Sequence, residues 1–343
     1  MTSVERVTLA LQGQKTDRAP VVPEIIQHSL EVTGIHHRQY STDANALARA
    51  QIACQEKYGY DAVYVSSDNY ILTEALGAKI ILPEDEPPQL PRHLLDKIRA
   101  DDLPAFSAQN GRVPVILEAT RLCREHYGDN NVYIKTCIDS APFSLAACLC
   151  GPENWMIALM DEDEEENVHA LLDKCVQIAI DMGVAAAKAG AHAIAYGDSA
   201  AGLVSRDMYA RFALPYARKA NQAIQNATGL PVFYHICGST RHIIDLMVET
   251  GAACLEIDSL MDMREAAKVA AGRCALEGNV STMQAFLNGT PADVSREADA
   301  LLDYFQNRGG FILGSACEIP RHSPSENVRA LTLAAEQFPY EKE

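Results

Sequence analysis

The sequence has few basic residues, no long apolar run and no glycine-rich phosphate-binding motif. Its 343 residues contain 29 Lys and Arg against 46 Asp and Glu, which gives a net charge of −17. A surface this acidic repels phosphate backbones, and no basic stripe offsets it, so a nucleic-acid partner is excluded. No window approaches the roughly 18 uncharged apolar residues of a membrane span. Residues 1–17 lack the apolar segment of a signal peptide, so we expect no membrane partner and a cytoplasmic location.

Cysteine is too scarce and too scattered for a disulfide-rich scaffold. The ten cysteines lie mostly in apolar runs such as residues 147–150, and no two of them form a C-x-x-C pair. We therefore expect most of them to be reduced, buried and small hydrophobic residues. With 48% hydrophobic residues the chain can fill a sizeable core, and its length fits one large barrel or two domains.

Short apolar runs rich in β-branched residues alternate with stretches of helical period along the chain. The predicted strands cover residues 21–26, 62–66, 132–138, 192–197, 231–237, 254–259, 274–280 and 310–317. The predicted helices cover residues 45–58, 113–126, 153–160, 165–188, 205–228, 240–250, 263–271, 291–307 and 325–337. Eight strands that alternate with helices predict an α/β fold, a closed (β/α)8 TIM barrel. An open doubly wound sheet is the alternative, but its usual glycine-rich phosphate loop is missing.

Residues 71–110 do not fit this alternation. Prolines and acidic residues crowd residues 82–88, and Pro91 follows shortly afterwards, so we expect no regular element there. We interpret the segment as an insertion between the second and third strands that lies over one rim of the barrel. Residues 1–343 are expected to form a single domain around it.

The carboxyl ends of the predicted strands are unusually polar, and in a barrel these ends surround the active site. The fifth run ends in His235 and Cys237, whose spacing of two places both side chains on one face. The eighth run ends in another thiol, Cys317. One imidazole and two thiolates form a donor set suited to Zn²⁺, with a fourth position left open. The alternatives are a buried histidine beside two structural thiols and a nucleophilic Cys–His pair.

Further polar and aromatic residues at the strand ends are candidates for the pocket. Asp198 and Glu256 are predicted to be catalytic, as a fourth ligand, a partner of His235 or a proton donor. We predict substrate-binding roles for a second group: Tyr196, Asp139, Phe143, Glu277, Asn279 and His322. The alternatives are a solvated rim or a salt bridge for the carboxylates, packing for the aromatic residues and a structural turn for Asn279.

With these residues in view, the chain resembles the uroporphyrinogen decarboxylase superfamily over nearly its whole length. The stretches that carry the resemblance are residues 6–13, 17–21, 278–281, 289–291 and 323–327. The decarboxylase carries an arginine-rich segment just after the first strand, whereas residues 23–29 here contain no arginine. By contrast, His235-x-Cys237 with Cys317 resembles the zinc motif of the corrinoid-linked methyltransferase branch. That branch includes the methylcobalamin:coenzyme M methyltransferases and the methyltransferase I components of anaerobic O-demethylases.

The resemblance implies zinc at His235, Cys237 and Cys317, and a corrinoid (cobalamin) carried by a partner protein. It leaves two directions of methyl transfer open. Zinc either activates the ether oxygen of a methoxylated substrate, whose methyl group passes to a Co(I) corrinoid, or holds a thiol that takes the methyl group from methyl-Co(III). Because the residues after Cys317 depart from the coenzyme M branch, we favour a small methylated substrate, a methoxylated aromatic donor. A metal-free decarboxylase and a non-catalytic zinc-binding barrel are further alternatives, and the sequence carries no signal for an oligomeric state.

Overall fold

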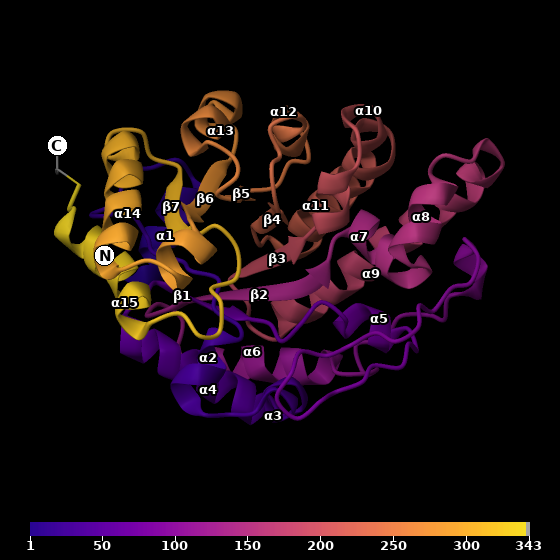
Figure 1. The fold of residues 1–343 in the computed structure, drawn as a ribbon, viewed down its shortest axis with the longest axis horizontal. Helices are drawn as coiled ribbons and strands as arrows, with labels where there is room; N and C mark the ends of the chain where they lie inside the picture. Colours follow the sequence, from indigo (N-terminus) through magenta and orange to yellow (C-terminus); the bar gives the residue numbers. More distant parts are fainter. Residues whose placement is uncertain (341–343) are drawn as a thin grey trace.

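In a computed structural model that describes residues 1–340, seven parallel strands form one curled sheet in chain order (Figure 1). They are β1 (Ala62–Val65), β2 (Tyr133–Ser140), β3 (Ala193–Gly197), β4 (Val232–Ile236), β5 (Cys254–Ile257), β6 (Ala275–Val280) and β7 (Phe311–Ser315). Nearly all strand residues are buried, as in parallel sheets that are covered on both faces. The predicted α/β class with a parallel sheet is therefore confirmed.

The first of the eight predicted strands, residues 21–26, is wrong as a strand and contributes a single bridge residue. Val21 forms a parallel bridge to Leu313 of β7. On its other side, the Val21 carbonyl accepts a hydrogen bond from Asp61 N, just before β1, at 2.7 Å. Pairing ends there because Pro23 has no N–H to donate to a ladder. The segment thus lies between the first and last strands without forming a strand of its own.

Helices lie between successive strands and cover the outer face of the sheet (Figure 1). The α-helices are α1 (Ser3–Leu11), α2 (His28–Thr33), α3 (His37–Thr42), α4 (Ala44–Tyr58), α5 (Ile71–Ala75), α6 (Val113–Tyr127), α7 (Pro142–Cys150), α8 (Pro152–Ala158), α9 (Glu165–Lys188), α10 (Arg206–Met208), α11 (Leu214–Thr228), α12 (Ile244–Val248), α13 (Met263–Ala270), α14 (Pro291–Phe305) and α15 (Ser325–Gln337). Shorter turns of 3-10 or π type are η1 (Ala100–Asp102), η2 (Glu162–Glu164), η3 (Ser199–Leu203), η4 (Tyr209–Ala213) and η5 (Thr282–Leu287).

The long amphipathic helices agree with their predicted ranges. The predictions for residues 165–188 and 325–337 coincide with α9 and α15. The predicted helix over residues 205–228 is divided, because the π turn η4 separates α10 from α11 and Pro215 occupies the first turn of α11. The sequence missed α1, α2, α3, α5 and α7. Of these, α7 is apolar on all sides and has no polar face to mark its period.

Residues 71–110 contain little regular structure, as expected. Beyond α5 and η1, they form one isolated antiparallel bridge, between Ile81 and Gln89. The segment is fastened to its surroundings by an ion pair from Asp85 to Arg321, which follows β7, at 3.0 Å. That the segment is an insertion in a barrel stays a prediction.

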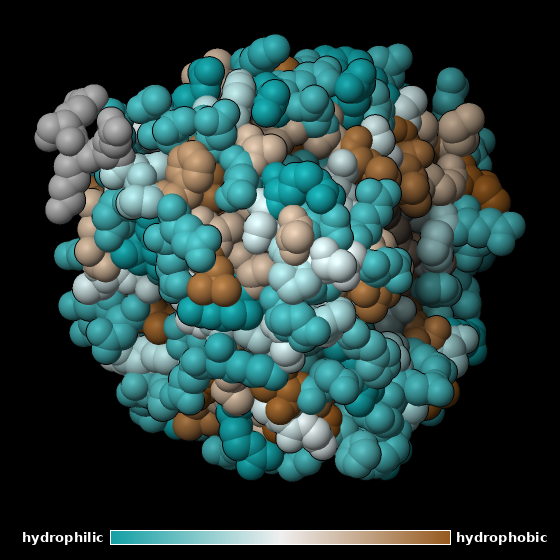
Figure 2. Space-filling view, turned by 60° about the vertical axis from the view of Figure 1, so that its left-hand side comes forward, coloured by the Kyte–Doolittle hydropathy of each residue, from teal (hydrophilic) through white to brown (hydrophobic). Residues whose placement is uncertain are grey.

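The surface is largely polar and rich in ion pairs. The face in Figure 2 is mostly hydrophilic, with apolar residues gathered in small islands. Lys219 is a typical exposed charged residue, and its Nζ lies 2.6 Å from Asp173 Oδ1. Within residues 1–340, every helix is too short or too polar to cross a membrane.

Candidate metal centre and active site

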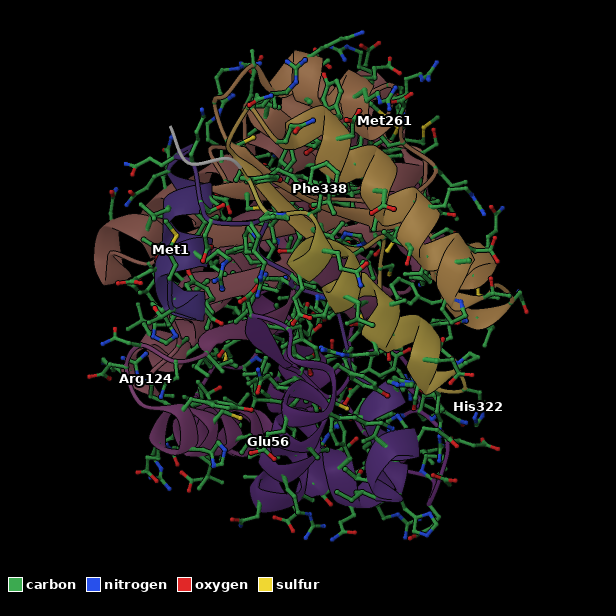
Figure 3. The ribbon with its side chains drawn as sticks, turned by 90° about the vertical axis from the view of Figure 1, so that its left-hand side faces the viewer. Met1, Glu56, Arg124, Met261, His322 and Phe338 are labelled. Carbon is green, nitrogen blue, oxygen red and sulfur yellow. The ribbon has the colours of Figure 1, made fainter. Side chains whose placement is uncertain are left out.

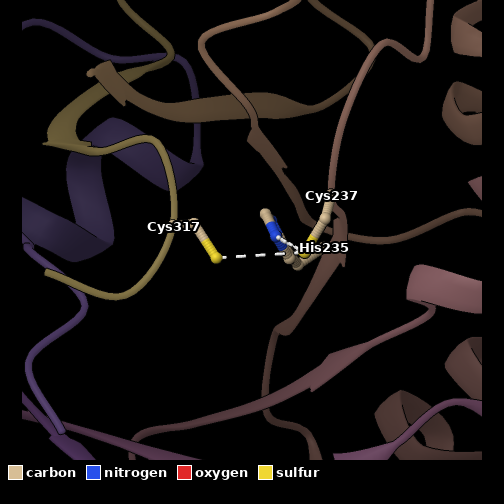
Figure 4. A group of neighbouring side chains, drawn as sticks. All are labelled: His235, Cys237 and Cys317. Carbon is tan, nitrogen blue, oxygen red and sulfur yellow. Dashed lines mark hydrogen bonds between the residues drawn. The ribbon is translucent and has the colours of Figure 1, made fainter. Parts of the chain in front are cut away.

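Three side chains from two strand ends meet in one group. Cys237 directly follows β4 and Cys317 follows β7, and parallel strands bring their carboxyl ends to the same side of a sheet. His235 Nε2 lies 3.0 Å from Cys237 Sγ, and the two sulfur atoms lie 3.9 Å apart (Figure 4). The three ligand atoms all lie within 4.8 Å of one another. The structure therefore brings together the three residues predicted as metal ligands, which we call the ligand group.

Hydrogen bonds from neighbouring strand ends orient the ligand group. His235 Nδ1 donates to the main-chain carbonyl of Glu256 on β5, at 3.2 Å, which leaves Nε2 as the atom that faces Cys237. Ser199, just after β3, donates its hydroxyl to Cys237 Sγ at 3.3 Å. An imidazole held through its second nitrogen, together with two thiols, is typical of a three-ligand zinc site. The donor set thus fits zinc, and three donors would leave one of its four tetrahedral positions unfilled.

Electrostatics favour ionised forms within the ligand group. The hydrogen bond from the Cys317 thiol, aided by His235, lowers the pKa of Cys237 to about 3. Burial lowers the pKa of His235, but contact with the Cys237 thiolate outweighs it and raises that pKa to about 10. The same thiolate raises the pKa of Cys317 well above its usual value. These shifts favour a thiolate at Cys237 beside a protonated His235, and a bound divalent cation would displace the protons that the three ligand atoms carry.

A buried lysine lies beneath the ligand group, inside the sheet. Lys135 Nζ contacts Glu256 Oε1 and Glu277 Oε1, each at 2.6 Å, and its side chain is 1% exposed. Its ammonium also lies 4.9 Å from the centre of the Phe233 ring. Burial raises the pKa of Glu277 to about 8, although Lys135 opposes the shift, and Glu277 Oε2 has no hydrogen-bond partner. The catalytic role predicted for Glu256 and the substrate-binding role predicted for Glu277 stay predictions, and both carboxyl groups contact the same ammonium.

Asp198 lies close behind the ligand group and is fully buried. Its carboxylate accepts hydrogen bonds from Tyr234 Oη at 2.7 Å and from Ser144 N at 2.9 Å. Its own N–H donates to the His235 carbonyl at 2.7 Å, which ties the end of β3 to β4. Burial raises the pKa of Asp198 to about 6 despite these hydrogen bonds. A catalytic role for Asp198 stays a prediction, and its contacts show that it positions Tyr234, next to the ligand His235.

The other predicted substrate-binding residues lie in varied surroundings. Phe143 is fully buried and packs edge-on against Trp155. Tyr196 is also buried and donates its hydroxyl to Asn221 of α11. The Asn279 amide donates to two main-chain carbonyls in the loop after β5. His322 lies at the edge of the molecule, 3.1 Å from Glu31 (Figure 3). The structure brings none of these four into the ligand group.

Asp139, the penultimate residue of β2, has an unusual backbone conformation and is buried. It has a φ of 79°, in the left-handed region, and is 5% exposed. Its carboxylate accepts hydrogen bonds from Leu72 N and from Ser140 Oγ, each at 2.8 Å. Burial nonetheless raises the pKa of Asp139 to about 7. The contact with substrate predicted for Asp139 stays a prediction.

Asp139→Asn is expected to remove part of the pH dependence of stability. The pKa of Asp139 is 3.8 in a model peptide and about 7 in the folded chain, so ionisation favours the unfolded state. This carboxyl therefore costs no stability below pH 4, and the cost grows to at most about 4 kcal/mol as pH rises through 7. Asn keeps the shape and tolerates a positive φ. Urea unfolding at pH 5 and pH 8 should show the variant gaining on the wild type at the higher pH. An equal difference at both pH values would contradict the assignment.

Lys135 and Ser199 are the residues of the site that sequence reasoning missed. Lys135 is the one charged residue in the predicted strand over residues 132–138. A lone charge in a strand that is buried on both faces needs a partner, so this signal was available. Ser199 carries no such signal, because serine is common just after a strand.

Comparison with known proteins identifies the family. The sequence profile of the uroporphyrinogen decarboxylase (URO-D) family matches residues 2–338. The chain belongs to this family. The family resemblance that the sequence indicates is thus confirmed over nearly the full length.

Two relatives and one solved structure indicate the branch of the family. Methylcobamide:CoM methyltransferase MtbA of Methanosarcina mazei is 30% identical over 99% of each chain. The methylated-thiol–coenzyme M methyltransferase of the same organism is 26% identical, over 99% of this chain and 90% of that protein. A solved structure of a methyltransferase from Methanosarcina mazei has a TM-score of 0.87 and 26% identity, over 98% of this chain and 99% of that one. The URO-D family member described here is an enzyme of the methyltransferase class, as predicted.

Proposed function

We propose that this chain is a zinc-dependent methyltransferase that moves a methyl group from a corrinoid on a partner protein to the sulfur of a small thiol. The observation that carries the proposal is the ligand group, whose three donors leave a fourth position free. The names of relatives aligned over nearly the whole chain, which include methylcobamide, coenzyme M and a methylated thiol, support it.

The chemistry follows from the donor set. Zinc, when bound, would keep a substrate thiol in the reactive thiolate form at neutral pH. In the transfer, the S–C bond forms as the Co–C bond breaks, the electron pair stays on cobalt as Co(I), and the thiol proton leaves to solvent. The Glu256 carbonyl keeps the His235 ring in one orientation, and the Ser199 hydroxyl stabilises negative charge on Cys237.

A methoxylated aromatic donor, which the sequence favours, has less support than the thiol. The relatives named above act on coenzyme M by name. The aromatic residues predicted to bind substrate, Phe143 and Tyr196, are fully buried in packing contacts. A metal-free decarboxylase would have no use for the two thiols of the ligand group, and residues 23–29 lack arginine. The thiol acceptor therefore takes first place.

We also infer that the sheet closes as a (β/α)8 barrel. Residues 20–22 fill the gap between β7 and β1 that an eighth strand would otherwise occupy. Their main chain forms hydrogen bonds to Leu313 of β7 on one side and to Asp61, just before β1, on the other. Residues 71–110 are then the insertion at one rim, with Asp85 held by Arg321 in the loop that follows Cys317.

An assay with free methylcobalamin tests the proposed reaction. The zinc-loaded chain, kept anaerobic with methylcobalamin and 2-mercaptoethanesulfonate, should cause a thiol-dependent loss of the methyl-Co(III) absorbance and form the methyl thioether. A chelator such as 1,10-phenanthroline should stop the reaction, and added zinc should restore it. Methylation of Co(I) cobalamin by a methoxylated benzoate, without activity toward thiols, would instead establish the aromatic donor. Activity that survives complete zinc removal would overturn the proposed role of the ligand group.

A further inference from the structure

Two leucines beside the ligand group are the most exposed leucines within residues 1–340. Leu203 is 80% exposed and Leu260 is 71% exposed. Leu203 ends η3, which follows β3, and Leu260 lies in the loop after β5. Isolated apolar residues are common on protein surfaces, so exposure alone carries no conclusion. The position of these two leucines and the composition of the loops around them are what point to a function.

Both loops lie against the main chain at Cys237 and Gly238. Gly202, the neighbour of the first leucine, lies so close that a Cβ there would be 3.1 Å from the Cys237 carbonyl oxygen. On the other side, the Asp258 carboxylate accepts hydrogen bonds from Gly238 N at 2.9 Å and from Leu260 N at 2.8 Å. The two leucines therefore flank the same metal ligand, one on each side.

Two of the loops around the ligand group also lack charge. The loops after β4, β5 and β7 do carry charge, at Arg241, Asp258, Asp262, Glu318 and Arg321, but the loops after β3 and β6 contain no Asp, Glu, Lys or Arg over residues 199–205 and 281–288. Charged residues make up 22% of the whole chain, so these two neutral loops contrast with the rest of an acidic surface. The last stretch adds another exposed apolar side chain, Met283, at 53% exposure. Depletion of charge with exposed apolar side chains is characteristic of the cores of protein interfaces.

We propose that Leu203 and Leu260 belong to the surface on which the corrinoid-carrying partner protein docks. The inference rests on the proposed function, because a cobalt-bound methyl group reaches the ligand group only when its carrier covers this rim. The two neutral loops suit the contact, since they carry no charge that would have to be desolvated as the two proteins meet. Apolar contact on both sides of Cys237 also keeps water away from the transferring methyl group.

Methyl transfer from two donors tests the surface. One donor is a methylated corrinoid-binding protein from the organism that encodes this chain, and the other is free methylcobalamin, which needs no protein docking. For Leu203→Ser/Leu260→Ser, the ratio of kcat/KM for the protein-bound donor to kcat/KM for the free donor should fall at least about tenfold relative to wild type. Leu333→Ser, on the outer helix α15, is the matched control and should leave the ratio unchanged.

Each outcome separates docking from the chemistry. A zinc-loaded double variant with an unchanged ratio would overturn the docking surface and leave the proposed function in place. A wild type that uses free methylcobalamin but not the protein-bound donor would also overturn the docking surface. Loss of a wild-type dimer on gel filtration, with an unchanged ratio, would assign the rim to a second copy of the chain. No turnover of either donor by the wild type would overturn the proposed function itself.

Discussion

Cys237→Ala and Cys317→Ala are each expected to abolish both zinc binding and methyl transfer. The wild type should contain about one zinc per chain and each variant close to none, because the two donors that remain form no stable zinc site. Thiol methylation should fall on the order of a thousandfold or more, since no metal ion remains to hold the thiolate. Elemental analysis measures the first effect, and the absorbance of methylcobalamin measures the second.

Cys274→Ala is the matched control for these variants. Cys274 lies next to β6, is partly buried like the two ligand thiols, and lies outside the ligand group. Its replacement should leave both zinc content and activity at the wild-type level. Zinc retained in Cys237→Ala and Cys317→Ala, or lost equally in Cys274→Ala, would show that the metal is bound elsewhere.

Seven of the eight predicted strands are present because their signal is local. A short apolar run between turn residues is enough to mark a strand that is buried on both faces. The run that begins at Val21 carries the same signal, yet Pro23 removes the donor that a ladder needs. The apolar residues of this run alone predict a strand, but the missing N–H group of Pro23 prevents one.

The ligand group was predictable for reasons of geometry that apply to any parallel sheet. Residues two apart on a strand share a face, which joins His235 to Cys237, and strand ends converge, which joins both to Cys317. Register then shows what the sequence could not. Glu256 pairs with His235 and so shares its face, whereas Tyr196 pairs with Tyr234 on the opposite face, toward α11.

The direction of Tyr196 could not be predicted because its strand has no alternation. In a strand that is apolar on both sides, nothing in the sequence distinguishes the inner face from the outer one. Phe143 was expected near substrate but packs on Trp155 for a different reason: it lies on α7, a helix that the sequence did not predict. Charged residues do distinguish the faces, which makes Lys135 the most informative residue that was overlooked.

Lys135→Met is expected to lower the free energy of unfolding by about 3 to 5 kcal/mol at pH 7. The substitution leaves two carboxyl groups, Glu256 and Glu277, buried without a cation, and their side chains are only 8% and 4% exposed. Removal of one member of a buried ionic group costs much more than the group contributes as a whole. Urea unfolding of the wild type and the variant measures the difference.

Lys219→Met is the control that separates the effect of burial from the effect of the distance between the paired charges. The Lys219–Asp173 pair has the same separation of 2.6 Å, but its side chains are 59% and 54% exposed, so its loss should cost less than about 1 kcal/mol. The triple variant Lys135→Met/Glu256→Leu/Glu277→Leu should recover most of the stability lost in Lys135→Met, because no charge is then left buried. If Lys135→Met costs no more than Lys219→Met, the two carboxyl groups do not depend on Lys135. If the triple variant is as unstable as the single one, the loss comes from packing and not from charge.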